Sequence, residues 1–402
     1  MTRFIALALV CIGVNALGQS KALVLDEQTV VALVRSRAPS VMASRSRGEK
    51  ARAARVGAGA PSANPNLAAS AGPRIIAGVP ALDVALLLSV PFDVSGLPSR
   101  RAAVADEYAR VADAGTRRAE WLAIGETLEL WVRTGVAADR LQLEEQRVRL
   151  DAERLRSARV RRAAGAVGDG DIALALLLEA EGKARHEVAA AEHQALVTEL
   201  RFALGLAREE FIAPVSVAPA GSIAELPALL DTLQRHPELV LAKASVDAAA
   251  KETALQRGLG VPLPRVTLTG ERSPEYVARI GFDIALPVFQ RNQTQTAIAE
   301  AREQTGAFIL GLLGQRLEAE VRAAYSRLLG ARAAYNALQA ALSSIDDAEH
   351  LTSRAYELGQ IPLAQVVAVH RETAAARSAL LDAKAAALRA QIVTQLASGS
   401  LL

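Results

Sequence analysis

Two stretches of this chain alternate apolar and polar residues in the manner of an amphipathic β-strand. Over residues 276–286, five apolar residues share one face of the predicted strand: Ala278, Ile280, Phe282, Ile284 and Leu286. Over residues 82–90, leucine and valine hold every second position in the same way. Each stretch has about the length that a tilted strand needs to cross a bilayer. The alternative is a small amphipathic sheet resting on helices, because alternation alone does not identify the apolar medium.

Each of these strands has a weaker partner just before it, over residues 66–74 and 265–272. Turn-forming residues, Gly78-Val79-Pro80 or Ser273-Pro274, separate the partners, so the sequence predicts two β-hairpins. Four strands cannot close a barrel within one chain, and an open edge in lipid would leave backbone groups without hydrogen-bond partners. If the hairpins lie in a membrane, several chains must therefore share one barrel.

Apolar residues at alternating steps of four and three predict long helices that pack along a seam. In the second half of the chain the seam consists of Leu317, Val321, Ala324, Leu328, Ala331, Tyr335, Leu338, Leu342 and Ile345. A shorter seam in the first half consists of Trp121, Ile124, Leu128, Trp131, Gly135 and Ala138. No proline interrupts residues 99–161, and a single helix there would extend about 90 Å. Glycine-containing turns at residues 164–171 and 356–363 then lead into a second helix.

The chain repeats the order helix, β-hairpin, long helical hairpin. Four landmarks occur in this order in both halves: Arg37-Ala38-Pro39 and Arg235-His236-Pro237, Asn64-Pro65-Asn66-Leu67 and Leu263-Pro264-Arg265-Val266, Val90-Pro91-Phe92 and Leu286-Pro287-Val288-Phe289, and Val167-Gly168-Asp169 and Leu358-Gly359-Gln360. We therefore expect a first structural repeat at residues 19–214, a linker at 215–224 and a second repeat at 225–402. Paired elements of this kind build one symmetric object. The predicted fold class is mainly α with a small β part.

The N-terminus has the pattern of an export signal. Arg3 precedes an apolar stretch at residues 4–14, and Ala16-Leu17-Gly18 offers small residues for a signal peptidase. We expect residues 1–18 to be a signal peptide. The only cysteine, Cys11, lies inside it, so the mature protein would have no disulfide and no thiolate chemistry. No later segment has the roughly 20 apolar residues of a transmembrane helix.

Composition and spacing narrow the function classes. Hydrophobic residues make up 51% of the chain but aromatic residues only 3%, which suits closely packed helices rich in alanine and leucine. The net charge is only +3, with arginines scattered among glutamates, so we expect no nucleic acid partner. His186-Glu187 and the later His193 are too far apart for a zinc-peptidase motif. Asp346, Asp347, Glu349 and His350 spread around a helix, which favours a solvated face over a metal site. We expect no enzyme activity, no cofactor and no metal site.

These patterns together resemble the TolC-type outer membrane efflux family, over essentially the whole mature chain. The most specific parts are Pro287-Val288-Phe289-Gln290-Arg291-Asn292-Gln293 and Tyr356-Glu357-Leu358-Gly359. The former is similar to a stretch in the outer membrane components of cobalt-zinc-cadmium type efflux systems, although Thr294 stands where those relatives usually have glycine.

The resemblance implies a homotrimer in the outer membrane of a Gram-negative cell. Each chain would give four strands to a shared β-barrel in outer membrane lipid and its long helices to an α-helical barrel across the periplasm. Such a protein performs no bond chemistry. It is a passive exit channel that docks to a periplasmic membrane-fusion adaptor and, through it, to an inner-membrane proton-driven pump.

The resemblance and the patterns also assign roles to residues. The adaptor-docking tips match Val167, Gly168, Asp169, Leu358, Gly359 and Gln360, whose glycines serve as helix caps in any case. A candidate gate consists of Arg161, Arg162, Asp169 and Asp171, where carboxylate rings of three chains would select cations and pair with arginine. The alternative is that the aspartates cap the helix that starts near Ile172. The alternation makes Ile280, Phe282 and Ile284 the lipid-facing residues of the second hairpin.

The cargo is a separate question, because a passive channel inherits specificity largely from its pump. The stretch at residues 287–293 favours heavy-metal cations. The alternatives are efflux of organic toxicants, a type I secretion channel, and a periplasmic coiled-coil scaffold; the scaffold would explain the long helices but not the alternating strands.

Overall fold

The structure is a computed structural model of the 402-residue chain, and it describes residues 23–401 except 62, 77, 208, 209, 211, 214, 216, 220, 221, 223 and 274. The predicted signal peptide lies outside the described residues. The elements of the first half are α1 (Glu27–Arg37), α2 (Pro39–Ala53), β1 (Asn66–Ile76), β2 (Val79–Pro91), α3 (Leu97–Ala163) and α4 (Asp169–Ala203). Those of the second half are α5 (Leu226–Asp231), the short 3-10 helix η1 (Thr232–Arg235), α6 (Pro237–Leu259), β3 (Arg265–Ser273), β4 (Glu275–Asp283), α7 (Gln293–Ala340), α8 (Leu342–Glu357) and α9 (Leu363–Ser398).

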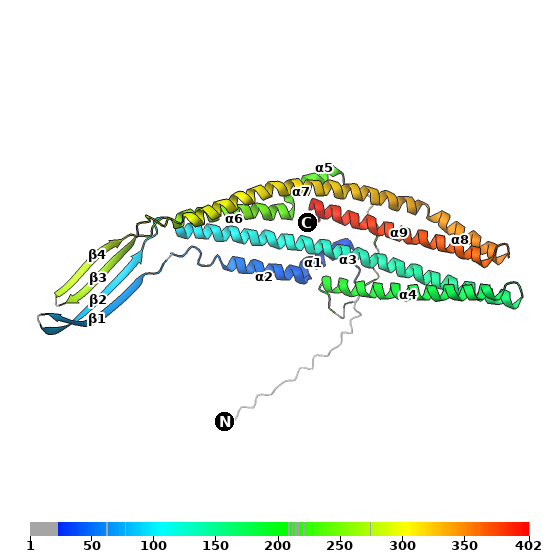
Figure 1. Cartoon of the computed structure of the whole chain (residues 1–402), viewed down its shortest axis with the longest axis horizontal. Coiled ribbons are helices and arrows are strands. Elements are labelled where there is room, and N and C mark those ends of the chain that lie inside the picture. The colour runs from blue at the N-terminus through cyan, green and yellow to red at the C-terminus, as the bar shows by residue number, and fades with distance from the viewer. Residues whose placement is uncertain are drawn as a thin grey trace, which may run out of the picture.

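The molecule is long and narrow (Figure 1). The sheet lies at one end, and the two turns that connect α3 with α4 and α8 with α9 lie at the other. The helix α3 has 67 residues without a break, as its seam and its lack of internal proline predict. Among the described residues, no helix is long and apolar enough to cross a membrane.

Both halves use the same backbone devices at corresponding positions. Ala38 and His236, which precede the proline that starts α2 or α6, have nearly identical φ and ψ (−59°, 129° and −58°, 128°). The residue before each long helix is left-handed, with φ of 70° at Gly96 and 58° at Asn292. Asparagine tolerates this region better than most residues do. The first pair of landmarks in the sequence, around Pro39 and Pro237, therefore marks a repeated conformation.

The four strands form one antiparallel sheet in the order β1-β2-β3-β4. Leu67 pairs with Leu88, Leu88 with Leu268, and Leu268 with Ile280, so these four side chains form a row across one face. The two predicted hairpins are confirmed, and they join through β2 and β3.

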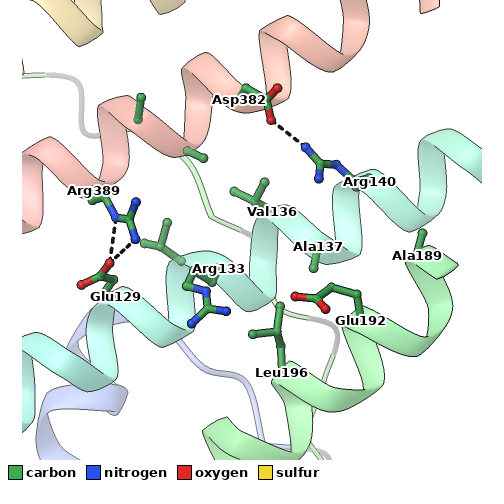
Figure 2. Close-up of a pocket in the computed structure, with 13 residues that line it drawn as sticks. Glu129, Arg133, Val136, Ala137, Arg140, Ala189, Glu192, Leu196, Asp382 and Arg389 are labelled. Atoms are coloured by element: carbon green, nitrogen blue, oxygen red, sulfur yellow. Dashed lines mark hydrogen bonds and ion pairs between the residues drawn. The ribbon is translucent and has the colours of Figure 1, made fainter.

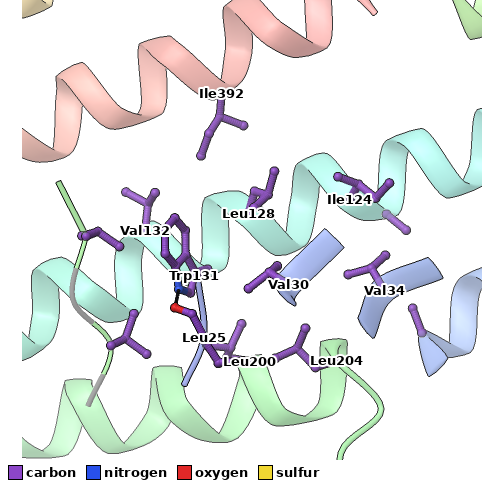
Figure 3. Packing of buried hydrophobic residues seen from close by; sticks show 14 of the residues in the cluster. Leu25, Val30, Val34, Ile124, Leu128, Trp131, Val132, Leu200, Leu204 and Ile392 are labelled. Carbon is purple, nitrogen blue, oxygen red and sulfur yellow. Dashed lines mark hydrogen bonds between the residues drawn. The ribbon is translucent and has the colours of Figure 1, made fainter. Parts of the chain in front are cut away.

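The largest core lies midway along the helices (Figure 3). Val30 and Val34 of α1 pack there against the α3 seam and the end of α4, and Trp131 donates its indole N–H to the Leu25 carbonyl at 3.1 Å. Val215 and Val217, placed in the predicted linker, are also buried in this core. Val217 packs on Gly135, where an added Cβ would come within 2.7 Å of it. Gly135 therefore serves packing against this segment.

The second seam departs from its prediction. Leu317, Val321, Ala324 and Leu328 are buried as expected, but the helix ends at Ala340, and α8 starts anew at Leu342. The predicted seam ran to Ile345 without interruption. Beyond Leu328 the predicted seam positions are only half-buried, and α8 contacts α9 through Asp346 and Glu349, which pair with Arg377.

Candidate functional site

One face of the sheet is apolar and exposed along its length. Ile280 is 82% exposed and Phe282 68%, although a folded chain normally covers such side chains. The other large apolar residues exposed on this face are Leu67, Ile75, Leu82, Leu86, Leu88, Leu268 and Tyr276. All four strands contribute, so the predicted alternation belongs to a continuous apolar surface.

The opposite face of the sheet is polar. Arg279 pairs with Glu271 at 2.8 Å across β3 and β4, and Arg74 lies 3.8 Å from Asp83 across β1 and β2. Gly281 also lies on this face, where an added Cβ would approach the Thr267 hydroxyl to 2.6 Å. A sheet with one apolar and one polar face suits the wall of a channel between lipid and water.

The prediction that Ile284 belongs to a strand is wrong. The strand β4 ends at Asp283, and Ile284 begins the irregular segment that leads to α7. The alternation continued in the sequence beyond the point at which β3 can offer a partner, because β3 begins at Arg265, opposite Asp283. Ile284 is nevertheless 40% exposed.

The two helical turns at the far end share one conformation. Gly165 and Gly359 are both left-handed, and each is followed by a residue whose N–H donates back into the helix: Ala166 to the Arg161 carbonyl at 2.8 Å and Gln360 to the Ala355 carbonyl at 2.9 Å. The predicted match of Gly168 with Gly359 is wrong. The equivalent of Gly359 is Gly165, and Gly168 precedes the next helix as its N-cap residue.

Two predicted gate residues meet at the first turn. Arg162 donates from Nε to Asp169 Oδ1 at 2.6 Å, and the hydrogen bond and charge of Arg162 lower the pKa of the Asp169 carboxyl. Both side chains are exposed. The alternative role predicted for Asp171, as a cap of the second helix, is wrong. The helix α4 already starts at Asp169, and Asp171 lies within its first turn.

Arg161 joins the two helical hairpins. Its Nη1 donates to the Tyr356 carbonyl at 2.7 Å, and its guanidinium lies 4.5 Å from the centre of the Tyr356 ring. Behind this contact is an apolar cluster formed by residues of α3, α4, α8 and α9: Leu155, Ala158, Ala175, Leu178, Tyr356, Leu363, Val366 and Val367. The tips of α3–α4 and α8–α9 are therefore fastened to one another within one chain.

A layer of buried charges lies between this tip cluster and the middle core. Asp151 on α3 accepts from Arg154 at 2.9 Å and lies 3.7 Å from His370 on α9. His370 in turn lies 3.1 Å from Glu349 on α8, which also pairs with Arg377. The Asp151 side chain is fully buried and those of His370 and Glu349 nearly so. The solvated face predicted for Glu349 is wrong.

This ionic layer changes the protonation of one member. The hydrogen bond with His370 and the guanidinium of Arg377 lower the pKa of Glu349 from 4.5 to about 2, against the effect of burial. The layer could not be predicted, because it joins α3 to α8 and α9, which lie in the second half of the chain. The available signal on α3 is Asp151, a charged residue four positions before Leu155 and thus on the same side of the helix as that apolar residue.

A cleft of about 360 Å³ lies between α3, α4 and α9 (Figure 2). Ion pairs border it, with Arg389 bound to Glu129 and Arg140 to Asp382 at 2.6 Å. Its wall combines alanine and valine with these pairs, which is the surface of splayed helices and not a constellation for acid–base catalysis. Among the described residues, no group of histidine, cysteine, aspartate and glutamate could hold a metal ion.

Residues 228–400 match the sequence profile of the family described as outer membrane efflux protein. No curated protein matches the chain in sequence.

Several solved structures share the whole fold. The CusC structure, from work on transmembrane channel formation, has a TM-score of 0.78 at 17% identity and covers 92% of this chain and 91% of its own. The outer membrane protein VceC of Vibrio cholerae has a TM-score of 0.75 at 16% identity, with 93% and 96% covered. The CmeC outer membrane channel of Campylobacter jejuni has a TM-score of 0.75 at 14% identity, with 93% and 85% covered.

Proposed function

We propose that this chain, a TolC-type outer membrane efflux protein by its fold and by the sequence of residues 228–400, forms one third of a passive exit channel. The family consists of channels that catalyse no reaction. The observation that carries the proposal is the sheet. Its two faces differ in polarity, and within the described residues its outer strands, β1 and β4, each have a neighbouring strand on one side only.

Closure of the sheet then requires other copies of the chain. Unpaired backbone groups are not tolerated in the hydrocarbon of a bilayer. Three copies placed side by side would join β4 of one to β1 of the next and leave no free edge. The exposed row through Leu67 and Ile280 would face outer membrane lipid, and the polar row through Glu271 and Arg279 would line the lumen.

The far end of the molecule is proposed to dock to a periplasmic adaptor that links the channel to an inner-membrane proton-driven pump. The candidate contact residues are Val167, Gly168, Asp169, Leu358, Gly359 and Gln360, which all lie at the two turns of this end. Asp169 and its partner Arg162 are exposed there, so both can exchange partners when another protein or another copy arrives.

A gate at this end is proposed to consist of Arg161, Arg162, Asp169 and Asp171. Carboxylates of three copies around the axis would favour cations. Recordings of single channels in a planar bilayer test this directly: Asp169→Asn should lower the preference for potassium over chloride, whereas Glu187→Gln, a change of equal charge far along α4, should not. Equal selectivity in both variants and the unmodified protein would exclude Asp169 from the conduction path.

Heavy-metal cations are our proposed cargo. Support comes from the likeness of residues 287–293 to cobalt-zinc-cadmium type systems. A channel that passes metal ions onward should not retain them, and a tight site is not part of that role. Deleting the gene and restoring it on a plasmid tests the cargo: growth in zinc, cobalt or cadmium should fall on deletion and recover. Sensitivity to organic toxicants alone would replace the metal proposal with multidrug efflux.

A further inference from the structure

The segment between β4 and α7 exposes every large apolar side chain that it carries beyond Ile284. Leu286 is 75% exposed, Val288 61% and Phe289 83%. The corresponding segment between β2 and α3 exposes Phe92 and Val94. Two apolar surfaces at the same point of a repeated fold indicate an apolar neighbour outside the chain.

Three polar side chains at the end of the second segment hydrogen-bond to backbone groups, two within the segment and one on α6. Arg291 donates from Nε to the Pro287 carbonyl at 2.9 Å, and Gln293 donates from Nε2 to the Phe289 carbonyl at 3.0 Å. Gln293 Oε1 also accepts from the Arg291 N–H at 2.7 Å, and Asn292 donates to the Gln256 carbonyl on α6 at 2.7 Å. A loop whose side chains bind several of its backbone groups, and which exposes apolar side chains beside polar ones, is suited to the boundary between lipid and water.

The first segment reaches the same organisation with different residues. Asp93 Oδ1 accepts from both the N–H and the hydroxyl of Ser95 at 2.9 Å. The Phe92 N–H donates to the Pro264 carbonyl at 2.8 Å, which leaves its ring on the surface. The two halves have diverged in sequence here, but both expose apolar side chains and both hold a polar side chain in a local hydrogen bond.

We propose that these five side chains, Phe92, Val94, Leu286, Val288 and Phe289, form a lipid-binding collar at the periplasmic boundary of the outer membrane. The inference rests on the proposed channel, and it adds a membrane contact outside the strands. It also gives the motif at residues 287–293 a physical role, in which Arg291, Asn292 and Gln293 hold the loop that presents Val288 and Phe289 to lipid.

Continuity with the sheet identifies lipid as the occupant. Leu286 and Val288 continue the every-second-residue pattern of Ile280 and Phe282 past the end of β4. The strand has nine residues, which at 3.3 Å each and a tilt of about 40° cover roughly 23 Å. The apolar band of an outer membrane barrel is about 25 Å tall. The collar therefore completes the band and reaches the headgroup level on the helical side.

Tryptophan fluorescence in lipid vesicles tests the collar. The full-length variants Phe289→Trp, Phe282→Trp and Val160→Trp are each reconstituted in phosphatidylcholine whose acyl chains are brominated near the carbonyl end, with unbrominated lipid as reference. The natural Trp121 and Trp131 are buried among the helices and give a constant background, which the unmodified protein measures. Val160 is 70% exposed near the opposite end of α3 and is the matched control.

We expect bromine to quench the introduced indole of Phe289→Trp about as strongly as that of Phe282→Trp and to leave the emission of Val160→Trp unchanged. Quenching at position 282 without quenching at 289 would overturn the collar and leave the channel intact. A blue-shifted but unquenched emission at position 289 would show that a second copy covers it, which also overturns the collar. If bromine quenches neither Phe282→Trp nor Phe289→Trp, the membrane channel itself is overturned. If Phe289→Trp does not assemble, Val288→Trp replaces it in the same measurement.

Discussion

The two ends of this molecule differ in which side chains they expose and which they bury. At the sheet end, Ile280 and Phe282 are exposed, and two strand edges have no partner within the described part of the chain. At the tip end, Arg161 binds Tyr356, and Asp151, Glu349 and His370 lie buried between helices.

This difference shows which end of the molecule is packed by contacts within one chain and which end is not. The tip end is fastened within a single chain, since the two helical hairpins meet in the apolar cluster and the ionic layer. In the proposed channel, lipid covers one face of the sheet and strands of other copies cover its edges. Changes at the sheet should therefore affect assembly, and changes at the tip should affect local stability.

The largest effect is expected from Ile280→Arg. Arginine at mid-membrane on a lipid face costs about 2–4 kcal/mol, so trimers in the outer membrane should be lost. Fractionation of cells and unheated gel electrophoresis measure this loss. Ser70→Arg on the polar face is the matched control and should assemble; Gly281→Arg is unsuitable, because Thr267 leaves no room for its Cβ. Normal trimers of Ile280→Arg would refute the assignment of the lipid face.

Much of the sheet end could be predicted from the sequence, because a period of two residues reports directly which side chains share a face. Leu88 and Ile280 lie on the face that their alternation predicts, and the register of the two hairpins places them in one row. The end of β4 could not be predicted in this way. It depends on where β3 begins, which is a property of the partner strand.

A smaller effect, confined to the tip, is expected from Glu349→Gln. The change removes the carboxylate shared by His370 and Arg377, and loss of one partner in a buried ion pair costs about 3 kcal/mol. Hydrogen exchange should speed up in α8 and the facing part of α9 but not in the sheet. Glu357→Gln disrupts only an exposed pair with Arg354 and should leave exchange unchanged. Equal exchange in both variants would show that the ionic layer does not hold α8.

The same carboxyl predicts a dependence on acid. The pKa of Glu349 is lowered from 4.5 to about 2 in the folded chain. The stability that it contributes is therefore fully present above pH 4.5 and is lost as the pH falls toward 2. Urea unfolding followed by circular dichroism between about pH 5 and pH 2 should show this loss. The free energy of unfolding should fall less steeply with decreasing pH in Glu349→Gln than in the unmodified protein. Parallel slopes would contradict the assignment.

The smallest effect is expected from Arg161→Leu, which removes the hydrogen bond to the Tyr356 carbonyl and the contact with its ring. Each is worth about 1 kcal/mol at a partly exposed site. Protease cleavage at the turns should become modestly faster. Arg156→Leu, which loses only a 4.0 Å contact between exposed side chains, serves as the control. Unchanged cleavage in Arg161→Leu would show that the apolar cluster alone holds the tips together.

Less of the tip end could be predicted from the sequence. The glycine-containing turns could be predicted from their composition. The structural equivalence of Gly165 and Gly359 could not, because it depends on which glycine has a positive φ, and Gly168 lies only three positions from Gly165. The ionic layer depends on which helices are neighbours. Glu349 belongs to an exposed acidic run until α9 brings His370 and Arg377 against it.

The mass of the assembly extracted from outer membranes tests the central claim most directly. Native mass spectrometry of the full chain in mild detergent should give three copies of the processed chain, with no monomer at equilibrium. A monomer recovered from the soluble periplasmic fraction would contradict the account, because one chain cannot close this sheet or cover its apolar face.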